Sequence, residues 1–218
     1  MSVALRINSK QSVFGSVIAL TAACALSLGL FAAESASAAA VGAAAPDFTL
    51  VDTTGKSHTL SSYKGKTVVL EWFNKGCPYV KKHYEKSSNM QELQKKYAAK
   101  DVVWLTIVSS ATGEQGHEAP AAAETTRKDW KIASAATLLD EPGTVGRMYD
   151  AKTTPQMYVI DKDGVLKYNG AIDSIPSTNA KDISKAEKYF ANALDQVLAG
   201  QAVKTATTKP YGCNVKYK

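Results

Sequence analysis

The sequence predicts an α/β fold, in which a central mixed β-sheet is flanked by helices and preceded by a short N-terminal β-hairpin. Three stretches lead to this prediction. Residues 67–73 form an apolar, β-rich run, 102–108 form a second one, and Pro155 precedes a strand with alternating apolar residues. A continuous apolar run is typical of a strand that is buried on both faces of a parallel sheet. A helix between two such strands gives a right-handed crossover.

The hairpin that opens the fold is expected between residues 46 and 60. Phe48 and Leu50 alternate with polar residues, as in a half-buried strand. Thr54-Gly55 is a turn signal before a second short strand. His58 belongs to this second strand, and we expect its side chain at the surface.

The following elements alternate between helices and strands. The helix after Cys77 is expected to break near Ser87, and a capping box that starts at Ser88 opens a second helix. The remaining elements are a loop at 109–120, a helix at 119–131, a strand at 137–139, a helix at 145–149, a strand at 155–161, a turn at 161–164, a return strand at 165–168 and an amphipathic helix at 183–198.

The first 38 residues have the pattern of an export signal. Arg6 and Lys10 supply a basic start, 13–31 carries no charge, and Ala36-Ser37-Ala38 fits a cleavage site. We therefore expect a protein that is exported to the periplasm or secreted, with no membrane contact after cleavage. Because the apolar run is long, an uncleaved membrane anchor is the alternative. The predicted parts are a signal peptide (1–38), one domain (39–200) and a tail (201–218).

The composition narrows the function. Of the 218 residues, 45% are hydrophobic and 21% are charged, as in a globular protein, and the net charge is +6. The lysines are scattered among acidic residues, which argues against a nucleic-acid partner. Cys77 and His83 are six positions apart and Cys213 is remote, which matches no standard zinc spacing. We expect neither a bound metal nor another cofactor.

Cys77 is the candidate reactive residue, because it lies where the first strand gives way to a helix. Free backbone N–H groups and the helix dipole stabilise a thiolate at such a helix start. Pro78 suits the first helical position. The thiolate is the nucleophile, so this arrangement favours reactivity over an inert, buried cysteine. Three nearby lysines are expected to add positive charge: Lys75, Lys81 and Lys82.

These features together resemble the thioredoxin fold and, within it, the redoxin branch that includes peroxiredoxins and exported thioredoxin-like proteins. The resemblance covers residues 45–200 and rests on the order of its motifs. A strand ends at Trp72-Phe73, a cysteine begins the next helix, and Thr154-Pro155 precedes a hairpin and a final helix. The resemblance implies that the bond before Pro155 is cis and that the Thr154-Pro155 loop faces Cys77.

The sequence departs from the thioredoxin pattern at the cysteine motif. Neither 74–77 nor 77–80 contains a second cysteine, so the usual exchange within a Cys-x-x-Cys motif is impossible. Peroxiredoxins, by resemblance, carry Thr-x-x-Cys in the first frame, and Asn74 can offer a hydrogen bond from the position of that threonine. Arg147 is the candidate for the arginine with which peroxiredoxins hold the thiolate, although a basic residue there also has ordinary surface reasons.

Cys213 is the candidate resolving thiol. Loss of the signal peptide removes Cys24, and a sulfenic acid on Cys77 needs a thiol partner to escape irreversible oxidation. A flexible tail of this length reaches roughly 20–25 Å, enough to bring Cys213 to the site. Tyr211 and Tyr217 indicate a segment that docks, since aromatics are rare in disordered tails. A permanent structural disulfide and pairing between chains are the alternatives.

Three functions remain open at this point. The first is an exported thiol-dependent oxidoreductase with antioxidant, peroxidase-like chemistry on a peroxide. The second is a monothiol protein that exchanges disulfides with exported proteins, as in cytochrome maturation. The third is a non-catalytic thioredoxin-like binding domain. Both oxidoreductases need an external thiol reductant. The oligomeric state is left open.

Overall fold

The computed structural model describes residues 38–218. The predicted signal peptide lies outside these residues apart from Ala38, and so does Cys24. Within 38–218, no helix has the length and apolar character needed to cross a membrane. The helices are α1 (Pro78–Tyr84), α2 (Asn89–Ala98), α3 (Pro120–Asp129), α4 (Thr144–Met148) and α5 (Tyr189–Leu198), with single 3₁₀ turns at Leu60–Tyr63 and Ala180–Asp182.

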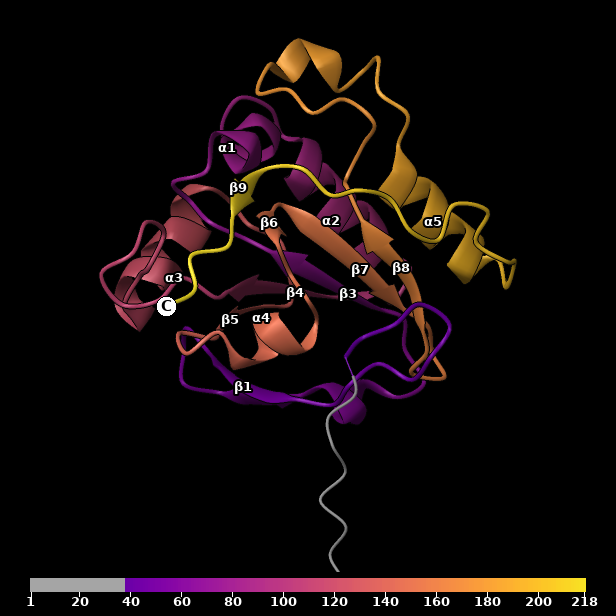
Figure 1. Ribbon diagram of the computed structural model, residues 1–218, viewed down its shortest axis with the longest axis horizontal. Helices are drawn as coiled ribbons and strands as arrows, with labels where there is room; N and C mark the ends of the chain where they lie inside the picture. The colour runs from indigo at the N-terminus through magenta and orange to yellow at the C-terminus, as the bar shows by residue number, and fades with distance from the viewer. Residues whose placement is uncertain (1–37) are drawn as a thin grey trace, which may run out of the picture. The chain divides into compact units, whose positions relative to one another are not determined.

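A seven-stranded mixed sheet forms the centre of the described domain (Figure 1), in the order β2-β1-β5-β4-β3-β7-β8. β3, β4 and β5 are parallel, whereas β1 and β7 join them antiparallel. This confirms the predicted thioredoxin-like α/β fold with a β1–β2 hairpin at its start. The strands are β1 (Thr49–Asp52), β2 (Ser57–Thr59), β3 (Val68–Trp72), β4 (Val103–Val108), β5 (Ala136–Leu139), β7 (Gln156–Ile160) and β8 (Leu166–Gly170).

Two further strands, β6 (Thr153–Thr154) and β9 (Cys213–Asn214), form a separate two-stranded sheet. β6 lies directly before Pro155 and β7, and β9 belongs to the C-terminal tail. The tail was predicted to dock through its aromatic residues, but a strand of two residues has no periodicity that a sequence could reveal. This small sheet joins the end of the chain to the motif around Pro155.

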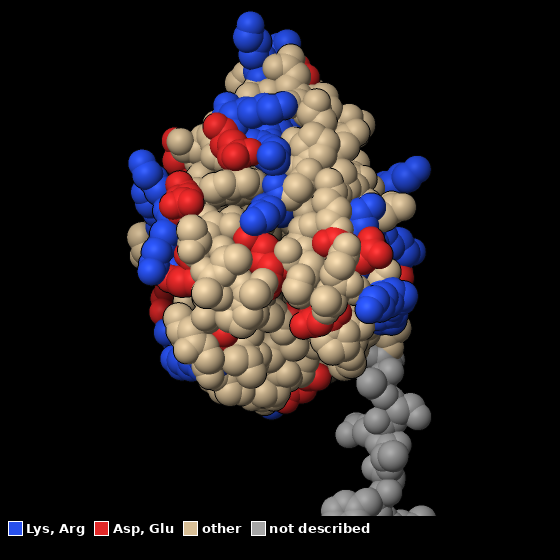
Figure 2. Space-filling view, turned by 90° about the vertical axis from the view of Figure 1, so that its left-hand side faces the viewer, with Lys and Arg blue, Asp and Glu red and all other residues tan. Residues whose placement is uncertain are grey.

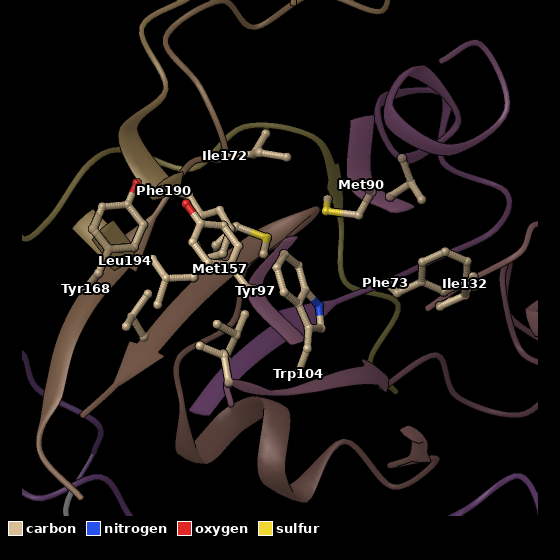
Figure 3. Close-up of a cluster of buried hydrophobic side chains, with 14 of the residues drawn as sticks. Phe73, Met90, Tyr97, Trp104, Ile132, Met157, Tyr168, Ile172, Phe190 and Leu194 are labelled. Carbon is tan, nitrogen blue, oxygen red and sulfur yellow. The ribbon is translucent and has the colours of Figure 1, made fainter. Parts of the chain in front are cut away.

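The central strands are covered on both faces, because alternate side chains point to opposite sides of the sheet. All five residues of β3 are buried. On one face, Val69 packs in a cluster with side chains of α1, α2 and α5, among them Tyr97 and Phe190 (Figure 3). On the other face, Leu70 and Trp72 pack with the α4 region. The strand that leads to Cys77 is thus rigidly embedded.

Three local expectations were wrong, each because of tertiary contacts. His58 is buried and lies between Asp52 (Nε2 to Oδ2, 2.8 Å) and Tyr63 (Nδ1 to the hydroxyl, 2.6 Å). Ser88 makes no side-chain cap at the start of α2. The last helix begins at Tyr189 rather than at residue 183, since the chain before it is tied to the loop that follows β8 by the 2.9 Å bond from Glu187 N to Ser174 Oγ.

Candidate functional site

Cys77 lies where the sequence places it, directly before Pro78 at the start of α1. Its side chain is 0% exposed. Its Sγ donates a hydrogen bond of 3.1 Å to the carbonyl oxygen of Thr154. The Thr154–Pro155 peptide bond is cis. The two motifs that are 77 positions apart therefore meet through the thiol of one and the backbone of the other.

Asn74 holds the loop between β3 and Cys77. Its Oδ1 accepts a 2.8 Å hydrogen bond from the backbone N–H of Gly76, and its Nδ2 donates to the carbonyl of Gln115 at 2.9 Å. The amide is almost fully buried. Gly116 makes room for it, because a Cβ there would lie 2.2 Å from Oδ1 of Asn74. The structure gives Asn74 a positioning role in this loop; contact with an oxidant stays a prediction.

The tail brings Cys213 to the same place. Strand β9 pairs antiparallel with β6, so that Cys213 lies opposite Thr154 and Asn214 opposite Thr153. Gly212 makes this close approach feasible. Its φ is +144°, and a Cβ on it would lie 2.0 Å from the carbonyl oxygen of Thr154. The structure thus groups four predicted site residues: Cys77, Thr154, Pro155 and Cys213.

The two cysteines meet at Thr154, which lies opposite Cys213 in the small sheet and accepts the hydrogen bond of Cys77. Burial raises the pKa of Cys213 to about 12, and a hydrogen bond to Cys77 and the charge of Cys77 add to this effect. Both cysteines are free thiols. A thiol with so high a pKa holds its proton at neutral pH, so Cys213 must lose that proton before it can act as a nucleophile.

The lysines near Cys77 do not form the positive cluster that the sequence suggested. Each ammonium has a carboxylate partner, which offsets its charge. The pairs, with their N–O distances, are Lys75–Glu118 (2.6 Å), Lys81–Glu85 (3.5 Å) and Lys82–Asp173 (3.5 Å). Lys82 is entirely buried and also donates to the carbonyl of Ile175 at 3.2 Å. Figure 2 shows basic and acidic side chains interspersed over one face of the domain.

Arg147 does not contact the thiol either. Its guanidinium donates to the carbonyls of Pro142 (2.8 Å) and Lys218, and it stacks over the ring of Tyr217 at 4.5 Å. The arginine thus binds the end of the tail. The candidate for holding the thiolate of Cys77 was therefore misplaced.

Glu71 is a buried acid that the sequence reasoning passed over. It lies in β3 and accepts hydrogen bonds of 2.8 Å from the hydroxyl of Tyr84 and from the indole N–H of Trp104. Burial raises its pKa to about 7, against the effect of these hydrogen bonds. A single glutamate within an apolar strand was the signal that could have identified it.

No cluster of three or more His, Cys, Asp or Glu side chains suited to a metal ion occurs within the part of the chain that the structure describes. The site itself brings together two cysteine thiols, the carbonyl of Thr154 and the start of α1.

The chain matches the AhpC/TSA family over residues 41–169. It is 28% identical over 130 residues to the thiol-disulfide oxidoreductase ResA of Geobacillus kaustophilus (strain HTA426), which covers 60% of this chain and 68% of that protein. It is 31% identical over 127 residues to the thioredoxin-like protein YneN of Bacillus subtilis (strain 168), covering 58% and 68%. The family match ends before the tail that carries Cys213.

Two solved structures have a similar fold. A hypothetical protein from Sinorhizobium meliloti 1021 superposes with a TM-score of 0.69 at 23% identity, over 84% of this chain and 97% of that one. An uncharacterized conserved protein from Geobacillus kaustophilus gives a TM-score of 0.67 at 26% identity, over 82% and 93%. Since the family match spans more than half of the chain and the thiol site has the matching fold around it, the chain belongs to the AhpC/TSA family as a thiol-based oxidoreductase with a thioredoxin-like fold.

Proposed function

We propose that Cys77 and Cys213 form one redox pair and that this pair carries out thiol–disulfide exchange on proteins. One observation carries the proposal: β9 holds Cys213 opposite Thr154, whose carbonyl accepts the hydrogen bond of the Cys77 thiol. The second cysteine that a Cys-x-x-Cys motif would supply next to Cys77 comes here from the far end of the chain. Thr154 and Pro155 position the pair, and Asn74 positions the loop.

The reaction has two steps. The thiolate of Cys77 attacks a substrate disulfide, which forms a mixed disulfide with Cys77 and releases one substrate thiolate. Cys213 then loses its proton and attacks the Cys77 sulfur, which releases the second substrate thiolate and forms the Cys77–Cys213 disulfide. The substrate gains two electrons and the protein loses them. An external thiol reductant returns both cysteines to thiols.

A peroxidase cycle is the second candidate, and the complete burial of Cys77 favours it, since a small oxidant needs less room than a protein. Here the thiolate takes the terminal oxygen of a peroxide, forms a sulfenic acid and releases an alkoxide or hydroxide. Cys213 converts the sulfenic acid to the disulfide with loss of water. The positions of Arg147, bound to the tail, and of Asn74, bound to its loop, favour disulfide exchange.

The decisive experiment compares the two oxidants on the wild-type chain and two variants, Cys77→Ser and Cys213→Ser. The reduced proteins are mixed with insulin, whose disulfides are reducible, or with hydrogen peroxide, and thiols are trapped and located by mass spectrometry. We expect wild type to form the Cys77–Cys213 disulfide with insulin faster than with peroxide. Cys77→Ser should react with neither, and Cys213→Ser should accumulate a mixed disulfide and lose turnover.

Two results would contradict the proposal. Faster oxidation by peroxide than by insulin would assign the peroxidase cycle instead. Normal turnover of Cys213→Ser with a reductant would remove Cys213 from the cycle and leave an external thiol to resolve Cys77.

We also propose that the chain is exported, as residues 1–38 predict, so that its substrates are exported proteins. The mass of the protein recovered from the cell envelope or medium tests this. A mature chain that begins at Ala39 is the expected result. An intact N-terminus in the membrane fraction would indicate an anchor.

A further inference from the structure

The tail crosses the site as a continuous segment. Figure 1 shows it in yellow, running from the end of α5 to β9 next to β6. Residues 211–218, which we call the strap, include β9, which pairs with β6 beside the Cys77–Thr154 contact. Cys213 packs against the core cluster that contains Cys77. Beneath the strap, Cys77 has no exposed surface.

The strap is anchored before the thiol by Tyr211. The hydroxyl of Tyr211 donates to Asp173, and its ring packs edge-to-face on Tyr79 with centroids 5.8 Å apart. The ammonium of Lys82 lies 5.8 Å from the ring centroid. Docking of Tyr211 therefore takes part in burying the Lys82–Asp173 ion pair, and burial of charged groups opposes docking.

A second anchor, Tyr217, follows the thiol. Its hydroxyl donates to the carbonyl of Ala151 at 2.8 Å, and the guanidinium of Arg147 lies 4.5 Å from its ring. Two glycines form the seat of the ring: a Cβ at Gly143 would lie 2.4 Å from it, and one at Gly146 would lie 2.3 Å from its hydroxyl oxygen. The anchor is shaped for one aromatic side chain.

Between the anchors, the hydrogen bonds that hold the strap are mainly main-chain ones, including one of 2.9 Å from Ala111 N–H to the carbonyl of Lys216, and Cys213 and Val215 pack against the core. β9 has two residues, and Val215 adds one 3.0 Å bond from its N–H to the carbonyl of Lys152. Most of the strap is half-exposed. Main-chain pairing at a strand edge is also how extended peptides bind to other proteins, and an edge pairs with one strand at a time. The centre of the strap thus occupies a surface suited to any extended chain.

We propose that the strap is a releasable occupant of the β6 edge, and that an extended, cysteine-containing segment of a client protein takes its place there to reach Cys77. The inference rests on the proposed disulfide exchange. A mixed disulfide between Cys77 and a protein cannot form while β9 covers the thiol. Cys213 leaves with the strap, and its return both resolves the mixed disulfide and expels the client from the edge.

The test measures access to Cys77 rather than catalysis. All variants carry Cys213→Ser, and alkylation of Cys77 is followed by mass spectrometry with iodoacetamide and with a maleimide on a polyethylene glycol chain. Gly212→Ala forces a Cβ onto the carbonyl of Thr154 at a φ of +144°. We expect it to raise both alkylation rates by about tenfold or more, because alanine is strained at a positive φ and the collision adds to that strain. The matched control is Gly164→Ala, with φ +82° and open space around the Cβ, which should leave both rates unchanged.

A second variant and an added peptide separate release of the strap from damage to the fold. Tyr217→Ala removes one anchor without touching β9 and should also accelerate alkylation. A synthetic peptide with the sequence of residues 209–218, with serine for Cys213, should slow alkylation of Tyr217→Ala again by competing for the empty edge. A misfolded site would not be protected by the peptide.

Unchanged alkylation rates in both Gly212→Ala and Tyr217→Ala would contradict the proposal that the strap controls access to Cys77. Faster alkylation of Tyr217→Ala that the peptide does not slow would contradict it as well. Neither result bears on the redox chemistry, which the cysteine variants test separately. Conversely, if Cys77→Ser still reduces insulin, disulfide exchange at this site fails, whatever the alkylation rates are.

Discussion

Asn74 shows how a single polar side chain fixes the loop that carries the candidate reactive cysteine. One amide connects the loop before Cys77 to the loop that contains Gln115, and both of its contacts are to backbone groups. A buried backbone group that loses its partner costs more than the hydrogen bond itself contributes. The position of Cys77 therefore depends on a residue that has no reactive group.

We expect Asn74→Ala to lower the free energy of unfolding by about 1–3 kcal/mol, because it leaves Gly76 N–H and Gln115 C=O unpaired. The free energy of unfolding of Asn74→Ser should lie between those of wild type and Asn74→Ala, since a serine hydroxyl can still accept the Gly76 N–H in a tight turn. Urea unfolding measures both. An Asn74→Ala chain as stable as wild type would show that the loop keeps its conformation without the Asn74 side chain.

From the sequence, the meeting of Cys77 with the Thr154-Pro155 motif could be predicted better than the contacts of the charged side chains around it. Cys77 and Pro155 could be identified because glycine, proline and β-rich runs constrain the backbone locally. The partners of Arg147 and of the lysines near Cys77 could not, since side chains far apart in the sequence decide them. Long, flexible cations bind whichever carboxylate or carbonyl the fold brings close.

At the scale of elements, β3 and α1 each bury an ionisable group with opposite consequences. Glu71 in β3 has its pKa raised by burial from 4.5 to about 7. His83 in α1 has its pKa lowered by burial from 6.5 to about 4, against the attraction of Asp173 and with the repulsion of Lys82. Both groups are neutral in the folded protein around pH 5–6.

The signs of the two effects follow from proton binding. Between pH 4.5 and 7 the folded chain holds a proton on Glu71 that the unfolded chain releases, so this group makes stability fall as pH rises. Between pH 6.5 and 4 the unfolded chain binds a proton on His83 that the folded chain does not, so this group makes stability fall as pH falls. The two effects offset each other over much of the same range.

We therefore expect Glu71→Gln to expose the acid sensitivity of His83, and His83→Gln to expose the alkaline sensitivity of Glu71. In each variant the free energy of unfolding should change by about 3 kcal/mol across the pH range of the remaining group. Urea unfolding of both variants and wild type over this pH range measures them. Parallel pH profiles in all three proteins would show that neither group is neutral in the fold.

The elements themselves were largely predictable, and the errors have tertiary causes. Ser88 gives no cap because its backbone (φ −99°, ψ 17°) is not in the extended conformation of an N-cap residue. Gln91, the other end of the predicted capping box, donates instead to the carbonyls of Tyr84 and Trp130. The helical period from residue 183 was real in the sequence. In the fold, the residues before Tyr189 are joined to the loop after β8 instead of forming the first turn of this helix.

At the scale of the whole molecule, a Cys77–Cys213 disulfide would close a loop that contains β4, β5, β7 and β8, four of the seven strands of the main sheet. A cross-link over a loop of this order removes much of the freedom of the unfolded chain. It would also fix the strap in its docked position. The oxidised protein should therefore be both more stable and more closed than the reduced one.

We expect oxidation to stabilise the fold by up to about 5 kcal/mol, as for loops on the order of 100 residues. Thermal unfolding with and without a reductant measures this, and Cys213→Ser should show no difference between the two conditions. A lower unfolding temperature for the oxidised chain would instead mean that the bond distorts the site.

The position of Cys213 near the end of the chain also has a consequence for biosynthesis. The ribosome completes every strand of the main sheet, and α5, before it adds Cys213, which at cellular rates takes on the order of ten seconds after Cys77. Throughout that interval the chain lacks both the proposed strap and the proposed resolving thiol. A transcript broken after α5 would yield a chain that contains the whole main sheet but lacks the strap that we propose to control access to Cys77. The codons for residues 211–218 thus supply both parts of the proposed control, the cover over Cys77 and the thiol that resolves it.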